Sequence, residues 1–276
     1  MSPPNSVPEA YRPGFLPPSI AKQMQENLPG AQHKLDPAPF DDVLADGSSA
    51  LEGANVLMHY HPKEKRDAEE AKDYIAKVAP DAQVELAEFD LSTEEECLKF
   101  VEKTKQWSHG QLHVLFNNAA TQNQIDNIED LPSEQWRHVF DVNIHSIFYL
   151  TKNLIPIMPW GSSIVNNASI NPFVGHPGLL DYTSTKGAII GFTRALSNQI
   201  VKDRGIRVNA VAPGPIWTPL VAATMTKDSL ESFGITTAIG RAGQPIEVAT
   251  AVVFLASVES SYFTAQTFHC NGGAVY

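Results

Sequence analysis

From residue 54 onward, short apolar runs alternate with longer stretches in which apolar residues recur every three or four positions. The runs at 54–60, 84–89, 112–116, 164–168, 206–211 and 266–270 have the length and composition of buried strands. Amphipathic helices are predicted between them, at 67–78, 92–107, 133–155, 181–202 and 245–256. This alternation predicts an α/β fold in which helices cover both faces of a parallel sheet.

Residues 1–53 have a different pattern. They are rich in proline and show no periodicity, as in the opening run SPPNSVPEAYRPGFLPPS. The sequence therefore predicts two parts, an N-terminal arm at 1–53 and a domain at 54–276. The arm either packs on the body or on a neighbouring subunit, or it is a disordered tail.

Three reactive side chains stand out in the segment that joins the 164–168 strand to the 181–202 helix. Tyr182 and Lys186 are four residues apart, so on a helix they lie side by side. Lowering a phenol pKa from about 10 to about 7 requires roughly 4 kcal/mol, which one cation at about 4 Å supplies in a partly screened site. We therefore predict that Lys186 lowers the pKa of Tyr182. Ser169 follows the apolar strand directly, where its hydroxyl can face a bound oxygen.

The spacing of Ser169, Tyr182 and Lys186 resembles that of the short-chain dehydrogenase/reductase family. The segments NNAA, DVNIHSIFYLTK and GIRVNAVAPGPIWTP resemble it as well, and the proline-rich leader is typical of one branch. The resemblance implies a Rossmann-like, doubly wound parallel sheet. It implies that Tyr182 is the catalytic acid or base, that Lys186 tunes it and contacts the ribose, and that Ser169 holds the substrate oxygen. Asn143 would bind a water in a proton relay.

The resemblance also implies a binding site for NADP or NAD. The residues expected to contact the cofactor are Asp90, Asn118, Tyr182, Lys186, Pro213, Gly214, Ile216 and Thr218. A basic cluster after the first strand, formed by Lys63, Lys65 and Arg66, suits an anion such as a 2'-phosphate. The residues expected beside the substrate cavity are Phe173, His176, Leu180 and Trp217.

One motif of the family is missing from the sequence. Its first strand and glycine-rich turn, TGxxxGxG, should stand between the leader and residue 54, but Leu51-Glu52-Gly53 runs directly into Ala54. About 25 residues of a βα unit are absent, including the glycines that let the backbone approach a pyrophosphate. We expect a sheet truncated at its first βα unit and weaker dinucleotide binding.

The missing strand is central in the family's sheet, and a hole there is not expected to persist. Either the 54–60 strand moves into the empty position with 84–89 beside it, or the leader supplies a substitute segment. In the first case the basic cluster would occupy the place of the phosphate loop. A third interpretation is a misassigned exon boundary.

Charge and composition limit the partners and the location. A net charge of -11 and a pI near 5.2 argue against nucleic acid or an anionic membrane surface as a partner. The two cysteines, Cys97 and Cys270, have no metal-ligating companions, which favours a reducing compartment and predicts neither a disulfide nor a metal site. We expect a cytoplasmic protein and, from the resemblance, a homo-oligomer, either a dimer or a tetramer.

The function that follows is an NAD(P)-dependent oxidoreductase acting on a small organic substrate, by reduction of a carbonyl or oxidation of an alcohol. Two alternatives remain. One is a cofactor-independent lyase, isomerase or cyclase that reuses the Ser-Tyr-Lys site. The other is an inactive homologue whose surface serves oligomerisation.

Overall fold

The computed structural model describes residues 54–274, so the predicted arm at 1–53 lies outside the described residues. The described strands, in chain order, are β1 (Val56–Tyr60), β2 (Val84–Glu88), β3 (Val114–Asn117), β4 (Ser163–Asn167), β5 (Arg207–Val211) and β6 (Thr267–Phe268). The helices between them are α2 (Lys65–Val78), α3 (Glu94–Trp107), α4 (Ser133–Phe140), α5 (Ser146–Leu154), α6 (Asn171–Val174), α7 (Leu180–Arg204), α8 (Pro219–Thr224), α9 (Lys227–Glu231) and α10 (Pro245–Ala256).

The predicted elements are all present, with small shifts at their ends. Helix α3 is capped by Thr93, whose hydroxyl accepts a hydrogen bond from the Glu96 amide, so the helix begins two residues after the predicted start at residue 92. The predicted helix at 133–155 is interrupted by a π-helical turn, Asp141–His145, between α4 and α5. Helices α8 and α9 lie between residues 211 and 245, where the sequence analysis predicts neither a helix nor a strand.

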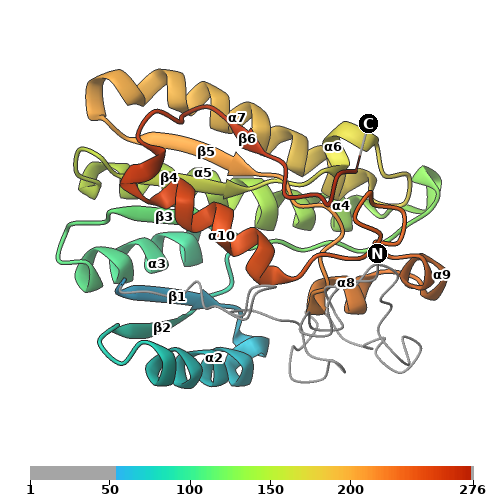
Figure 1. The fold of residues 1–276 in the computed structure, drawn as a ribbon, viewed down its shortest axis with the longest axis horizontal. Helices are drawn as coiled ribbons and strands as arrows, with labels where there is room; N and C mark the ends of the chain where they lie inside the picture. The colour runs from blue at the N-terminus through green and yellow to red at the C-terminus, as the bar shows by residue number, and fades with distance from the viewer. Residues whose placement is uncertain (1–53, 275–276) are drawn as a thin grey trace, which may run out of the picture.

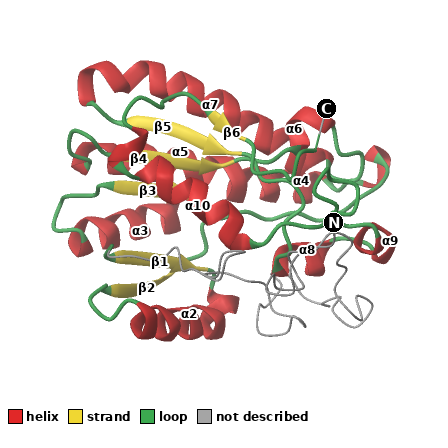
Figure 2. Ribbon diagram, viewed as in Figure 1, coloured by secondary structure: helices red, strands yellow, loops and turns green. Residues whose placement is uncertain are grey.

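Four strands form a parallel sheet in the order β3-β4-β5-β6. Helices α5 and α7 pack on one face of this sheet and α10 crosses the other (Figures 1 and 2). Ile164 and Val208 occupy paired positions of β4 and β5 and are fully buried, as expected for a sheet covered on both faces. The carboxyl ends of these strands point to the same edge, where the loops carry the predicted site residues.

Strands β1 and β2 form a separate two-stranded parallel sheet, with α2 packed on them. No ladder joins β1 to β3 within residues 54–274. The expectation that the first strand would move into the empty central position is therefore wrong. A substitute segment from the leader would lie outside the described residues.

Helix α3 explains why the two-stranded sheet stays apart from β3. The Phe100 ring of α3 packs on His59 of β1 and on Phe89 after β2, with ring centroids 5.3 and 5.5 Å apart. Lys103 of α3 also pairs with Glu85 of β2. These contacts hold β1 and β2 against α3, so sliding toward β3 would break them.

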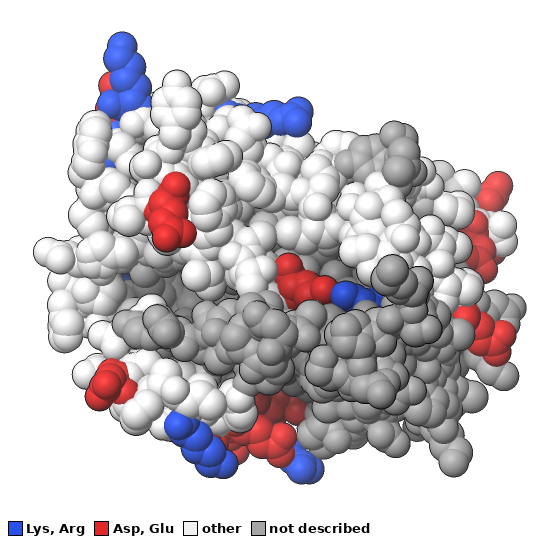
Figure 3. Space-filling view, viewed as in Figure 1, with Lys and Arg blue, Asp and Glu red and all other residues white. Residues whose placement is uncertain are grey.

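A hollow of about 3080 Å³ separates the two sheets and extends to the carboxyl ends of the strands. Val114 and Phe116 of β3 line it, and Phe116 is 40% exposed although its strand lies near the middle of the molecule. On the face shown in Figure 3, few charged side chains lie over β4, β5 and α10. The break in the sheet therefore exposes apolar surface that a continuous sheet would bury.

A buried arginine ties β5 to the end of α10. Arg207 is 7% exposed and donates hydrogen bonds to the carbonyls of Leu255 and Ser257 and to the hydroxyl of Ser260. The C-terminal carbonyls of a helix carry partial negative charge and favour a cation. Replacing this guanidinium leaves buried acceptors without a donor.

We expect Arg207→Met to lower the free energy of unfolding by about 2–3 kcal/mol, because each orphaned buried acceptor costs roughly 1–3 kcal/mol. Urea denaturation monitored by circular dichroism measures the change. The control is Arg204→Met at the exposed end of α7, for which a change within about 0.5 kcal/mol is expected. Equal stability of the two variants would contradict the structural role of Arg207.

Candidate active site

The three predicted catalytic side chains come together at the carboxyl edge of the four-stranded sheet. Ser169 lies two residues beyond β4, and Tyr182 and Lys186 lie on successive turns of α7. All three line the hollow. Helix α7 is packed against both β4 and β5, which fixes it over the ends of these strands.

Burial, rather than charge pairing, controls the acidity of the phenol. It raises the pKa of Tyr182 to about 12, and a hydrogen bond with Ser169 opposes the shift. The prediction that Lys186 lowers this pKa is therefore wrong. The Lys186 ammonium nitrogen lies 5.3 Å from the centre of the Tyr182 ring and donates to the Asn167 carbonyl at 2.6 Å.

Lys186 is itself desolvated. Its side chain is 1% exposed, and burial lowers its pKa to about 7. A lysine in such an environment has both protonation states within reach at neutral pH. Helical spacing placed the two side chains next to each other correctly, but the spacing alone could not show how much water each one loses.

Asn143 lies behind the site, in the π-helical turn between α4 and α5. Its amide donates to the Thr121 carbonyl at 2.9 Å and to the Thr185 hydroxyl at 3.1 Å, and its oxygen accepts from the Thr121 N–H at 2.7 Å. The side chain is fully buried. Single π turns inside helices are frequently found at functional sites. Asn143 thus fixes the loop after β3 to α7, and its binding of a relay water stays a prediction.

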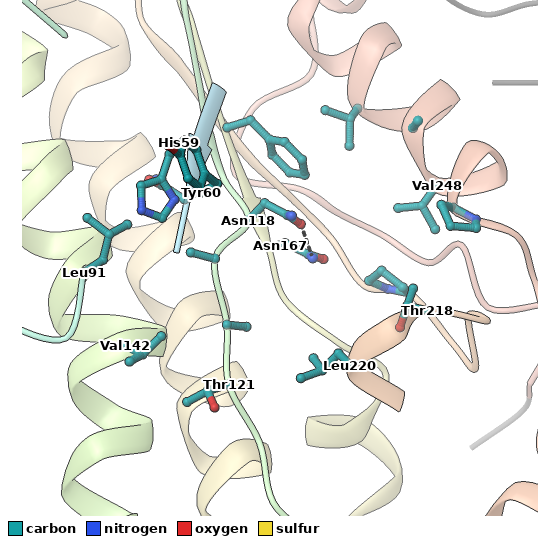
Figure 4. A pocket seen from close by; sticks show the side chains of 18 of the residues that line it. His59, Tyr60, Leu91, Asn118, Thr121, Val142, Asn167, Thr218, Leu220 and Val248 are labelled. Atoms are coloured by element: carbon teal, nitrogen blue, oxygen red, sulfur yellow. Dashed lines mark hydrogen bonds between the residues drawn. The ribbon is translucent and has the colours of Figure 1, made fainter. Parts of the chain in front are cut away.

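The predicted cofactor residues surround the same hollow. Asn167 donates through its side-chain amide to the Asn118 oxygen at 2.7 Å, and Figure 4 shows this pair between β1 on one side and Thr218 on the other. The hollow is also lined by Asp90, Pro213, Gly214, Ile216 and Thr218. All eight residues therefore border one space.

Close packing explains two features of the loop after β5. A methyl group on Gly214 would meet the Asn271 Cα at 2.8 Å, so only glycine fits there. Ile216 forms an isolated parallel bridge with Gly243, and the Trp217 N–H donates to the Gly243 carbonyl at 2.9 Å. These contacts hold Ile216 and Thr218 at the wall of the hollow.

Some residues expected beside the substrate do not lie there. His176 lines the hollow as expected. Trp217, however, is buried against Ala222 and Leu230. The Phe173 ring packs edge-on against the His269 ring, with ring centroids 4.7 Å apart. Leu180 is not part of the lining. Of the basic cluster, Lys63 lines the hollow, whereas Arg66 forms an exposed pair with Glu70. The cluster does not replace the phosphate loop.

Several lining residues were missed by the sequence reasoning. They come from the loop after β3, the turn before α7 and the stretch around α8 and α9: Gln122, Asn123, Leu179, Leu220, Val221, Met225 and Phe233. The only available signal was the position of these segments after predicted strands. Within residues 54–274, no group of three or more metal-ligating side chains occurs. No helix in that range is long and apolar enough to cross a bilayer.

Comparisons with known proteins agree with this geometry. Residues 48–275 match a family model described as "Enoyl-(Acyl carrier protein) reductase". General stress protein 39 of Bacillus subtilis is 42% identical over 93% of this chain and 97% of its own length. The chain belongs to the short-chain dehydrogenase/reductase family. It is an NAD(P)-dependent oxidoreductase with a Rossmann-like fold.

Two further relatives illustrate the range of the family. NADPH-dependent aldehyde reductase 1 of Arabidopsis thaliana is 40% identical over 92% of this chain and 98% of its own length. A dehydrogenase/reductase from Sinorhizobium meliloti superposes with a TM-score of 0.74 at 25% identity, covering 82% of this chain and 87% of that one. Likeness of fold therefore extends well beyond the site itself.

We expect stability to rise between pH 7 and pH 9 through Lys186, because its pKa is about 7 in the folded protein and 10.5 is its ordinary value. In this window the unfolded chain binds a proton that the folded protein does not, so raising the pH favours folding. The slope is at most about 1.4 kcal/mol per pH unit. Urea unfolding at several pH values measures it.

In Lys186→Met this slope should disappear, while it should persist in Lys202→Met, which changes an exposed lysine of the same helix. The range stops at pH 9 because burial raises the Cys97 pKa to about 12, which gives the opposite slope at higher pH. If the free energy of unfolding changed with pH in the same way in wild type and in Lys186→Met, a buried neutral lysine would be excluded.

Proposed function

We propose that the protein reduces the carbonyl group of a small organic substrate with NADPH, or oxidises the corresponding alcohol. The observation that carries the proposal is the grouping of Ser169, Tyr182 and Lys186 at the wall of one hollow. The similarity to NADPH-dependent aldehyde reductase 1 of Arabidopsis thaliana supports the choice of cofactor and substrate class.

Each side chain has a distinct role in the proposed reduction. The Ser169 hydroxyl binds the carbonyl oxygen, and Tyr182 gives its proton to that oxygen as negative charge develops there. A phenol whose pKa burial raises to about 12 is protonated at neutral pH, so it serves as an acid in this direction. Lys186 donates to the Asn167 carbonyl and would also hold the ribose of the dinucleotide, and Asn143 would complete the proton relay. Bound NADPH supplies the hydride.

The site fits one end of the dinucleotide better than the other. The amides of Asn118 and Asn167, the Lys186 amine and the loop containing Ile216 and Thr218 suit a nicotinamide and its ribose. For the pyrophosphate, TGxxxGxG occurs nowhere in the sequence. The alignment with general stress protein 39 has 282 positions but includes only 93% of this chain's 276 residues, about 257. About 25 positions of the alignment therefore have no counterpart in this chain, a number that a missing βα unit would account for.

The break between β1 and β3 favours a second candidate function. If the dinucleotide no longer binds, the Ser169–Tyr182 pair can still move a proton, as a cofactor-independent lyase, isomerase or cyclase requires. Only the first of the two requires that NADPH be consumed.

We also propose that the protein forms a homo-oligomer in the cytoplasm. The surface over α10 supports this proposal. Val253, Val258, Tyr262 and Phe263 are exposed there, and Tyr262 is fully exposed. Exposed apolar groups of this kind mark protein–protein contacts. The family resemblance favours a dimer or a tetramer.

We expect Tyr182→Phe to lower turnover of small aldehydes with NADPH by at least about 100-fold, the usual contribution of a general acid. Ser169→Ala should lose a similar factor, because a hydrogen bond to the developing oxyanion is worth about 10²–10³ in rate. Absorbance of NADPH follows the reaction. Tyr262→Phe, at a fully exposed tyrosine, is the matched control and should leave the rate unchanged.

Unchanged turnover in Tyr182→Phe would rule out both the reductase and the proton-transfer enzyme. Conversion of a substrate that depends on Tyr182 but proceeds in protein free of dinucleotide would favour the cofactor-independent function.

We expect NADPH to bind with a dissociation constant nearer the millimolar than the micromolar range, a loss of about 4 kcal/mol. Quenching of the nicotinamide fluorescence measures the affinity. A chimera with the first βα unit of general stress protein 39 inserted between Gly53 and Ala54 should bind in the micromolar range. Micromolar binding by the unaltered chain would show that the glycine-rich turn is dispensable.

A further inference from the structure

A buried carboxylate precedes the catalytic tyrosine. Asp181 lies in the first turn of α7, and 1% of its surface is exposed. Its Oδ1 accepts a hydrogen bond from the Tyr182 N–H at 2.7 Å, and its Oδ2 accepts one from the Gln135 side-chain amide at 2.9 Å. No basic side chain pairs with it in the described part of the chain. Burying a carboxylate without a neighbouring cation costs free energy of folding. The hydrogen bonds from the Tyr182 N–H and the Gln135 amide offset this cost.

Gln135 connects this carboxylate to the loop that follows β3. Its amide nitrogen also donates to the Asn123 carbonyl at 3.1 Å, and its oxygen accepts from the Asn123 side-chain amide at 3.2 Å. Gln135 and Asn123 both line the hollow. One glutamine of α4 therefore joins a wall of the hollow to the turn that carries Tyr182.

A second set of hydrogen bonds, through Thr185, fixes the same turn of α7. The Thr185 hydroxyl donates to the Tyr182 carbonyl at 2.8 Å and accepts from the Asn143 amide. Tyr182 is thus held through its N–H by Asp181 and through its carbonyl by Thr185. Asn143 is already expected to act in catalysis, whereas Asp181 and Gln135 have no assigned role.

We infer that Asp181 and Gln135 are positioning residues for the phenol of Tyr182. By fixing the first turn of α7 against the loop after β3, the pair sets the distance between the phenol and the substrate oxygen held by Ser169. Misplacement by about 1 Å can lower a rate by about 100-fold. The inference rests on the proposed function for its turnover assay. The competing explanation is an acidic residue that only stabilises the positive end of the helix.

Exchanging the two groups provides the test. Asp181→Asn places an amide against the Gln135 amide, and Gln135→Glu places two carboxylates together. In the double variant, the carboxylate introduced at position 135 accepts from the amide introduced at position 181, and the amide oxygen at position 181 still accepts from the Tyr182 N–H. The Asn123 carbonyl loses its donor, so recovery is expected to be incomplete. Each single variant should lower kcat about tenfold with KM within about twofold, and the double variant should recover to within about threefold of wild type.

Two further variants complete the design. Gln135→Met keeps the charge of Asp181. It should lower kcat as much as Gln135→Glu does, and it should leave the pH dependence of kcat unchanged. It also serves if the variants with a changed charge fail to fold. Asp130→Asn is the matched control, because the Asp130 carboxylate accepts from the Asn127 amide at 3.1 Å on the surface. It should leave kcat unchanged.

Hydrogen exchange of the Tyr182 amide gives a readout that does not need turnover. The amide should exchange faster in Asp181→Asn and Gln135→Met and return to the wild-type rate in the double variant. If wild type turns over no aldehyde, the proposed function fails, but the exchange rates still test the positioning. Loss of thermal stability with unchanged kcat in the single variants, or a double variant no better than the singles, would overturn the inference.

Discussion

Burial of the polar side of α7 is the constraint on which the rest of the structure depends. The helix places Lys186, Thr185 and Thr193 in the interior, where each polar group needs a partner. The Lys186 amine donates to the Asn167 carbonyl, and Thr193 accepts from the Asn166 amide at 2.9 Å. Since both partners belong to β4, the helix can satisfy its buried groups in only one register over that strand.

The network extends from β4 to the neighbouring strands. Asn117, the last residue of β3, donates to the Asn166 oxygen at 2.8 Å, so one chain of side-chain bonds crosses β3, β4 and α7. Farther along the helix, the hydroxyls of Ser197 and Thr264 lie 2.6 Å apart, and Thr264 accepts from the Val208 N–H of β5. In this chain of side-chain bonds, the buried Asn117 oxygen has no hydrogen-bond partner among the described residues. The remaining bonds fix α7 from Lys186 to Ser197 over β4 and β5, and thereby position the N-terminal turns that carry Tyr182.

Sequence reasoning identified the elements and the site residues because periodicity and spacing report local structure directly. Helical spacing brought Tyr182 next to Lys186, and the residues after each predicted strand do converge on one hollow. The acidity of the phenol could not be predicted in this way, because desolvation depends on packing from distant segments. Trp217 was placed wrongly for a similar reason. A large apolar side chain in a loop can face a cavity or fill a core. Trp217 fills a core because Ala222 and Leu230 pack against it.

Movement of the first strand into the central position was one of two outcomes that the sequence left open, and the argument for it considered only the strands. A central position left unfilled would leave strand edges without partners, which favours closure. The cost of closure lies elsewhere, in the contacts of Phe100 with His59 and Phe89 and in the Lys103–Glu85 pair. The bonds that hold Ser169, Tyr182 and Lys186 in place all lie within β3 to β6 and their helices, on the other side of the break. The proton-transfer half of the site therefore keeps its geometry independently of β1 and β2, whereas a bound dinucleotide would have to span the break.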